Sequence, residues 1–201
     1  MIHHTAMASA AEAVARLCDP VAEVSAHWLV EPDGTAHALV PEARRAWHAG
    51  AGRWGDATDV NSRSVGIELQ NRGDHPFAAP QMAALERLLG GVMGRWGIPP
   101  ERVIGHSDMA PERKSDPGPR FDWRRLARAG LSVWPGRGEE GALRAGLVAF
   151  GYDSGLSDEW LLRAFRLRFR PWAEGPEGEE DRRLACDLGR RWPVDRGAPP
   201  A

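Results

Sequence analysis

Cysteine is scarce in this sequence of 201 residues, and long hydrophobic runs are missing. The only two cysteines, Cys18 and Cys186, each fall in an apolar helical pattern, so we expect two buried small side chains and no disulfide framework. No apolar run reaches the roughly 18 residues of a membrane span. A formal net charge of −2 at pH 7 provides no broad basic face, so we expect no nucleic-acid partner.

Lysine is scarcer still, because Lys114 is the only one among the 26 basic residues. It lies in the segment HSDMAPERKSD (106–116), two residues before Asp116. An ammonium group is a compact point charge, whereas a guanidinium is a larger planar fork. A single lysine in a chain that otherwise uses arginine therefore indicates a position with a steric or catalytic demand, with chance as the alternative.

The hydrophobic content of 42% and the charged content of 27% are typical of a globular protein. The composition changes at 134–138, beyond which the apolar pattern is purely helical. We therefore predict a first domain over 1–136 and a three-helix module over 139–201. About 60 residues is near the lower limit for an independent core, so we expect the module to lean on the first domain.

The first domain alternates strand and helix signals, which predicts an α/β fold with a central mixed sheet flanked by helices. Tryptophans on helical patterns, at 96, 160 and 192, are expected in the core. The expected elements are a strand at 1–5, a helix at 10–17 capped by Ser9, a hairpin of 24–31 and 36–40, a strand at 64–70, a helix at 80–96, a strand at 102–106 and a helix at 122–129.

Three residues could bind a metal ion. His3 ends the first predicted strand, His106 ends a later one, and Asp116 follows in a proline-rich loop. Two histidines and one carboxylate suit a zinc site with three protein ligands and an open position. The chain contains seven histidines, so spacing alone leaves surface or core histidines as an open alternative.

The stretch from Ile2 to about Trp134 resembles the zinc-dependent type-2 N-acetylmuramoyl-L-alanine amidases. That superfamily includes bacterial cell-wall recycling amidases, phage amidase lysozymes and animal peptidoglycan recognition proteins. The C-terminal module resembles, more weakly, the helical peptidoglycan-binding domain of two-domain bacterial amidases. The segments that carry the similarity are IHHTA (2–6), VSAHWLV (24–30), AWHAG (46–50), NSRSVGIELQN (61–71) and GHSDMAPERKSDPGP (105–119).

The resemblance implies a zinc ion in a cleft of the sheet, held by His3, His106 and Asp116. Asp108 is the rival carboxylate, but the family's ligand directly precedes Pro-Gly-Pro. His4 falls where relatives often carry an aromatic residue or a cysteine, so it is left out of the metal shell.

The resemblance also implies hydrolysis of the amide between the lactyl group of N-acetylmuramic acid and L-alanine, in peptidoglycan or muropeptides, during cell-wall turnover or recycling. Glu68 would be the general base, on a strand that points it into the cleft and Ile67 and Leu69 the opposite way. Lys114 would stabilise the oxyanion. The alternative for Glu68 is a salt-bridged strand residue.

Further cleft residues are expected in the loop of 41–62 and just after it. His48 is assigned to substrate contact or loop packing, and Asn61 to substrate contact or a turn. Trp47 and Trp54 are the tryptophans expected to face a sugar. No candidate catalytic residue lies beyond Gly138, so a fragment that ends there is predicted to keep the chemistry.

Two other functions fit the sequence less well. A binding module that has lost catalysis typically lacks a ligand, whereas every expected ligand is present here. A zinc hydrolase of another amide is also open, although there is no HExxH helix. We expect a monomer, cytoplasmic as the sequence is written; residues upstream of Met1 would instead direct it to the periplasm or outer membrane.

Overall fold

The computed structural model describes residues 1–194 and contains a four-stranded mixed sheet with strand order β1-β4-β2-β3. β4 pairs in parallel with both β1 and β2, and β2 pairs antiparallel with β3. This confirms the predicted mixed sheet and the hairpin. The strands are β1 (Ile2–His4), β2 (Trp28–Val30), β3 (Ala36–Ala38) and β4 (Ile67–Leu69).

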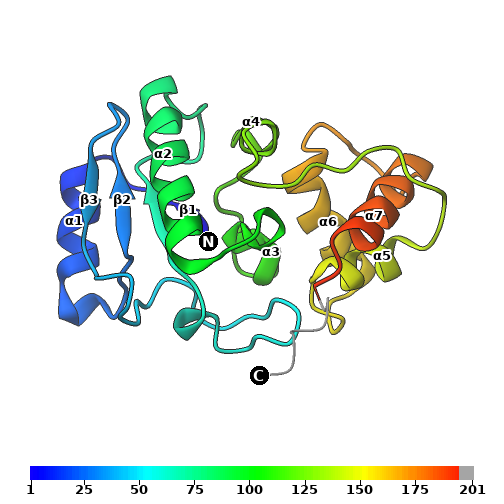
Figure 1. The fold of residues 1–201 in the computed structure, drawn as a ribbon, viewed down its shortest axis with the longest axis horizontal. Helices are drawn as coiled ribbons and strands as arrows, with labels where there is room; N and C mark the ends of the chain where they lie inside the picture. Colours follow the sequence, from blue (N-terminus) through cyan, green and yellow to red (C-terminus); the bar gives the residue numbers. More distant parts are fainter. Residues whose placement is uncertain (195–201) are drawn as a thin grey trace.

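Helices flank this sheet, and a separate group of three helices lies at one end of the molecule (Figure 1). The α-helices are α1 (Ala10–Cys18), α2 (Ala79–Trp96), α3 (His106–Met109), α4 (Trp123–Arg128), α5 (Leu143–Phe150), α6 (Asp158–Phe169) and α7 (Glu179–Arg191). Short 3-10 helices are η1 (Pro20–Ala22), η2 (Val60–Ser62) and η3 (Pro100–Arg102).

The two faces of the sheet are covered by different helices, because successive strand residues point to opposite sides. On one face, strand residues such as Ile67 and Leu69 pack against the apolar stripe of α2. On the other face, Leu29 packs against Ala10 and Ala13 of α1. Leu29 of β2 is paired with Glu68 of β4, and Glu68 is paired with His3 of β1. Leu29, Glu68 and His3 are therefore neighbours across this second face of the sheet.

The helix signals of the first domain are confirmed. The Ser9 hydroxyl accepts the Glu12 N–H (3.2 Å) and begins α1, and the Asp122 carboxylate accepts the Arg125 N–H (2.9 Å) and begins α4. Gly97, in the left-handed conformation at φ +62°, ends α2.

The expected strand at 102–106 is wrong. This segment meets β1 at a single bridge between Ile2 and Gly105, and His106 is the first residue of α3. The reason is local: the Asp108 carboxylate accepts the Gly105 N–H at 2.7 Å, which turns the chain into a helix. Gly105 also lies against the next loop, since an added Cβ would fall 2.8 Å from Cδ of Pro117.

Three predictions of burial are wrong as well. Cys18, at the end of α1, is exposed, and Cys186 is only half-buried; neither forms a disulfide within residues 1–194. Trp96 is 49% exposed, because its indole N–H reaches out to the Glu42 carboxylate (2.7 Å) instead of turning inward.

The helices α5, α6 and α7 share one hydrophobic cluster with the first part of the chain. Trp54 lies in that cluster and meets the rings of Phe150 and Tyr152 edge-on, with centroids 5.4 and 5.2 Å away. Ile104 and Met109 join it from either side of His106. The expectation that the module leans on the first domain is therefore confirmed. Trp160 and Trp192 pack against this cluster while partly buried.

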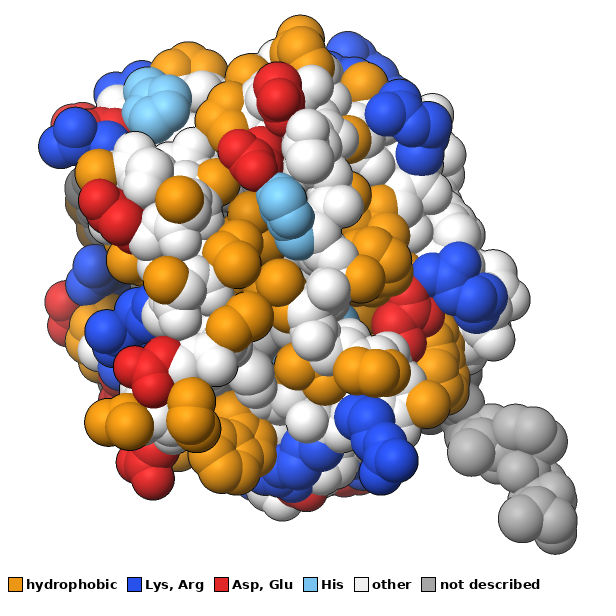
Figure 2. Space-filling view, turned by 90° about the vertical axis from the view of Figure 1, so that its left-hand side faces the viewer, with side chains coloured by type: hydrophobic (Ala, Val, Ile, Leu, Met, Phe, Trp, Pro, Cys, Tyr) orange, Lys and Arg blue, Asp and Glu red, His pale blue; other side chains and the backbone are white. Residues whose placement is uncertain are grey.

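The outer surface carries charges of both signs. On the face that holds α1 and β3, acidic and basic side chains lie interspersed among hydrophobic and neutral ones (Figure 2). Within residues 1–194, none of the helices combines the length and the hydrophobicity that crossing a bilayer requires.

Candidate metal centre and active site

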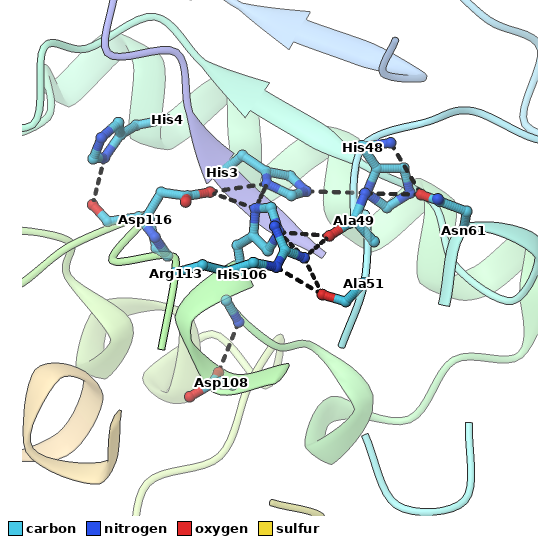
Figure 3. A network of polar contacts seen from close by, with 12 residues as sticks. His3, His4, His48, Ala49, Ala51, Asn61, His106, Asp108, Arg113 and Asp116 are labelled. Carbon is cyan, nitrogen blue, oxygen red and sulfur yellow. Dashed lines mark hydrogen bonds and ion pairs between the residues drawn. The ribbon is translucent and has the colours of Figure 1, made fainter. Parts of the chain in front are cut away.

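Three side chains from separate elements converge on one point beside the sheet (Figure 3). His3 comes from β1, His106 from the first turn of α3, and Asp116 from the loop that follows. Nδ1 of His3 lies 3.0 Å from Nδ1 of His106, and Oδ2 of Asp116 lies 2.9 and 3.2 Å from these two nitrogens. All three residues are buried, and together they form a group that could hold a metal ion.

The tautomer of His106 follows from its second nitrogen. Nε2 lies 2.8 Å from the carbonyl oxygen of Ala49, which can only accept a hydrogen bond. The proton is therefore on Nε2, and Nδ1 turns its lone pair toward Asp116 and His3.

A longer chain of hydrogen bonds determines the tautomer of His3. The Ser64 hydroxyl donates to the carbonyl oxygen of Val60 (2.6 Å), so its oxygen accepts from Nε2 of His48 (3.3 Å). Nδ1 of His48 is then an acceptor and receives the Nε2–H of His3 (3.0 Å). The Nδ1 atom of His3 is left with a lone pair that faces the cluster.

Two lone pairs and a carboxylate oxygen thus face one another at about 3 Å with no proton between them. Such an arrangement is favourable only around a cation. A tetrahedral zinc ion with bonds of about 2.0 Å would hold its ligand atoms roughly 3.3 Å apart, close to the observed spacing. The residues present therefore fit a divalent metal.

Burial and electrostatic interactions keep this cluster in the protonation state that a metal needs. Burial lowers the pKa of His3 to about 4, so this imidazole is neutral at pH 7. Burial would raise the pKa of Asp116, but its electrostatic interactions with His106 and His3 outweigh burial and hold that pKa well below its ordinary value. The carboxylate is charged and both imidazoles can be ligands.

The rival carboxylate, Asp108, lies outside this cluster. Its two oxygens accept hydrogen bonds from the Gly105 N–H, the Tyr152 hydroxyl and the Arg168 guanidinium, all at 2.7 Å. His4 points away as well, with Nδ1 3.1 Å from the carbonyl oxygen of Pro117.

Glu68 and Lys114 line the same cavity as the metal-binding group, a cavity of about 360 Å³. The Oε2 atom of Glu68 is buried and has no hydrogen-bond partner within residues 1–194. Burial and, to a lesser extent, the negative charge of Asp116 raise the pKa of Glu68 to about 8, against the opposing effect of the positive charge of Lys114. Lys114 is thus close enough to Glu68 to affect it electrostatically, and its backbone N–H donates to the Ala110 carbonyl (3.0 Å).

The four residues expected to line the cleft differ in where they lie. Trp47 is 51% exposed and lines the cavity, as does His48, which also contacts His3. The side-chain oxygen of Asn61 accepts hydrogen bonds from the backbone N–H groups of His48 and Ala49. This oxygen therefore holds the loop in place. Trp54 is only 6% exposed and packs under the helical module, so the expectation that it faces the cleft is wrong. Contacts of the first three with substrate stay predictions.

Sequence reasoning missed Ser64 and Arg113. The Arg113 guanidinium donates to the carbonyl oxygens of Ala49 and Ala51, which fixes the loop that carries His48. Gly66 was a signal for this close packing, because a glycine within a predicted strand, here 64–70, often marks a close approach of another group. A Cβ there would lie 2.4 Å from the His48 ring.

A family model described as N-acetylmuramoyl-L-alanine amidase matches residues 1–119. The chain is 34% identical, over 195 aligned residues, to the N-acetylmuramoyl-L-alanine amidase AmiD of Escherichia coli, an alignment that covers 79% of this chain and 71% of AmiD. It is 40% identical over 103 residues to the 1,6-anhydro-N-acetylmuramyl-L-alanine amidase AmpD of Enterobacter cloacae, covering 51% of this chain and 55% of AmpD.

Solved structures agree with these sequence matches over a longer stretch. AmiD from E. coli superposes with a TM-score of 0.85 at 33% identity, covering 95% of this chain and 88% of that one. AmpDh3 from Pseudomonas aeruginosa also gives a TM-score of 0.85, at 29% identity, covering 95% and 90%. Since the family match spans the residues of the metal-binding group together with Glu68 and Lys114, the chain belongs to the N-acetylmuramoyl-L-alanine amidases, hydrolases of an amide bond.

Proposed function

We propose that this protein uses one zinc ion, held by His3, His106 and Asp116, to hydrolyse the amide between the lactyl group of N-acetylmuramic acid and L-alanine. The observation that carries the proposal is the convergence of three lone-pair donors in a cavity that also contains Glu68 and Lys114. A zinc ion there would lower the pKa of a water molecule and polarise the scissile carbonyl.

Glu68 is proposed as the general base and acid. Its uncompensated, buried Oε2 atom can accept a proton from water and donate it to the leaving amine of L-alanine. A pKa raised to about 8 supports this role, because a group that titrates near neutral pH can both take up and release a proton.

Lys114 is proposed to stabilise the negative charge that develops on the carbonyl oxygen. Its ammonium is the positive charge that opposes the raised pKa of Glu68, which supports a position beside the reacting atoms. Lys114 is an exposed residue that lines the cavity, so its ammonium can reach a bound substrate, and a positive charge beside the reacting carbonyl stabilises an oxyanion.

The substrate is proposed to be a muropeptide of the anhydro type. E. coli AmiD has been solved with anhydro-N-acetylmuramic acid-L-Ala-D-γ-Glu-L-Lys, and that similarity at 33% identity supports the same substrate class here. Trp47, half-exposed at the cavity, is the proposed stacking surface for the sugar or peptide.

We also propose the division into an amidase part, 1–136, and a helical part, 139–201, with peptidoglycan binding by the helical part. The change of composition at 134–138 and the separate group of helices α5–α7 support it (Figure 1). The shared hydrophobic cluster supports folding of the two parts as one unit.

The test is Glu68→Gln, assayed on an anhydromuropeptide by mass spectrometry of the released peptide with a free N-terminal L-alanine. The amide is nearly isosteric with the carboxylate but cannot take the proton, so kcat should fall by about 10²–10⁴-fold while zinc content stays at wild-type level. Removal of zinc by a chelator should abolish turnover, and added zinc should restore it. A variant within a few-fold of wild-type kcat would remove Glu68 from the mechanism.

A further inference from the structure

The carboxylate of Asp108 is held by the helical module. Its Oδ1 accepts the Tyr152 hydroxyl and its Oδ2 accepts Nη1 of Arg168, both at 2.7 Å. Asp108 and Tyr152 are 1% exposed and Arg168 is 2% exposed, so this ion pair is sealed from solvent. Because a buried charge without its partner is costly, these three side chains hold one another in place.

Arg168 contacts other residues of the first part of the chain in addition to Asp108. Its Nη2 donates to the Val103 carbonyl (3.0 Å) and to the Ser132 hydroxyl (3.2 Å). Its guanidinium also lies 4.3 Å from the centroid of the Trp123 ring. One side chain of α6 therefore fixes the segment that leads into α3.

The short helix α3 in turn organises two of the three metal-binding residues. His106 is its first residue, and Asp108 accepts the N–H of Gly105, directly before it. The Ser107 N–H donates to the backbone carbonyl of Asp116 (2.9 Å). A shift of α3 would therefore move His106 and Asp116 together relative to His3, which lies on the sheet.

We propose that Arg168 and Tyr152 are positioning residues of the metal centre, which act through Asp108 on His106 and Asp116. This inference rests on the proposed function, since it concerns how the zinc site is held. The helical module then has a role at the active site although none of its side chains up to Val194, the end of the described chain, lines the cavity.

The alternative is that the buried network only stabilises the fold, and the chain offers a matched control. Arg166 lies two residues before Arg168 on α6, is also buried, and pairs with the buried Asp181 (Nη2 to Oδ2, 2.6 Å). Its other bonds go to the carbonyl oxygens of Gly175 and Pro176, within the module. Loss of Arg166 should therefore destabilise the protein without reaching α3.

The experiment compares full-length Arg168→Met, Tyr152→Phe and Arg166→Met with the wild type. Zinc affinity is measured by competition with a chromophoric chelator, the coordination geometry by the visible spectrum after cobalt(II) substitution, and the thermal midpoint by circular dichroism. We expect Arg168→Met to weaken zinc binding by about 10–100-fold, the scale typical of residues that orient metal ligands, and to change the cobalt spectrum. Arg166→Met should lower the thermal midpoint and leave affinity and spectrum unchanged.

Wild-type affinity and spectrum in Arg168→Met would overturn the inference, as would an equal weakening in Arg166→Met. If Arg168→Met does not fold, Tyr152→Phe decides: weaker zinc binding by several-fold in a folded protein supports the inference, and wild-type affinity overturns it. A wild-type protein that binds no zinc would contradict the proposed function itself.

Discussion

The single lysine lies where charge, size and position all matter. Lys114 follows Arg113, whose Nε and Nη2 donate to the carbonyl oxygens of Ala49 and Ala51, and it precedes the proposed ligand Asp116 by two residues. Both adjacent cations line the cavity, but Arg113 is bonded to backbone carbonyl oxygens, whereas Lys114 lies close enough to Glu68 to affect its pKa. The sequence alone marked this position as unusual, and the geometry gives it a physical reason.

Lys114→Arg should fold, bind zinc and lose about 10²-fold or more in kcat, the scale of removing one oxyanion donor. The guanidinium keeps the charge but is larger and planar, so it cannot take the place of the ammonium beside the reacting carbonyl. KM should change far less, because the interaction forms mainly in the transition state. Steady-state kinetics on an anhydromuropeptide check this, and a near wild-type kcat would make the lysine incidental.

His48 should affect zinc affinity through the tautomer of His3. In His48→Leu the Nε2–H of His3 loses its acceptor, and we expect zinc binding weaker by about 10–100-fold. In His48→Asn the side-chain oxygen takes roughly the place of Nδ1, so most of the affinity should return. Chelator competition on both variants measures this. Equal affinity in the wild type and both variants would show that the hydrogen bond to His3 has no such role.

At the scale of elements, local signals predicted most of the helices and strands, and long-range contacts decided the failures. The cap at Ser9 and the stop at Gly97 act within one helical turn, so they can be read from neighbouring residues. The segment of 102–106 has the composition of a strand, but it makes only a single bridge at Gly105, because Asp108, held from α6, accepts the Gly105 N–H and begins α3 at His106. Trp54 was expected at the cleft but is buried against Phe150, and Trp96 was expected in the core but reaches out to Glu42. Both predictions failed because these partners are far away in sequence.

The same distinction holds for the site. The ligand set and Glu68 come from short motifs that resemble a known family, so they could be predicted residue by residue. The groups that orient the ligands could not: Arg168 lies 60 positions from Asp108, and Ser64 acts on His3 through His48. Nothing in the local sequence around an arginine or a serine indicates such a partner.

The long loop of 41–62 is tied to α2 by a charged cluster that should weaken in acid. Hydrogen bonds from Arg95, Trp96 and Trp28 lower the pKa of Glu42 from 4.5 to about 2. A carboxyl whose folded pKa is lowered stabilises the protein fully above its unfolded value of about 4.5, and this contribution is lost as the pH falls toward 2.

Glu42→Gln should therefore lower the free energy of unfolding by roughly 1–2 kcal/mol at pH 7, a modest value because Arg95 is half-exposed. The gap between variant and wild type should shrink at pH 3. Urea denaturation at the two pH values measures both quantities. A gap of the same size at pH 3 and pH 7 would show that the charge of Glu42 is not what stabilises the loop.

At the scale of the whole molecule, the prediction that a fragment ending at Gly138 keeps the chemistry does not fit the structure. Removal of the helices would expose Trp54 and Met109 and would leave the Asp108 carboxylate without Arg168 and Tyr152. We now expect the fragment 1–138 to be aggregated or unfolded when expressed alone. Gel filtration and circular dichroism check this, and a monomeric, folded fragment with wild-type zinc affinity would contradict it.

The register of the sheet fixes the distance between two residues of the site, His3 and Glu68. His3 and Glu68 are direct neighbours across the parallel pair β1 and β4, and adjacent strands lie about 4.8 Å apart. The spacing between the proposed metal ligand His3 and the proposed base Glu68 is thus set by backbone hydrogen bonds, whereas Lys114 and Trp47 are carried by loops. A change of Trp47 alone would therefore alter which substrates bind while leaving that distance unchanged, whereas exchange of the loop that carries Lys114 would also replace Asp116 and so alter the chemistry.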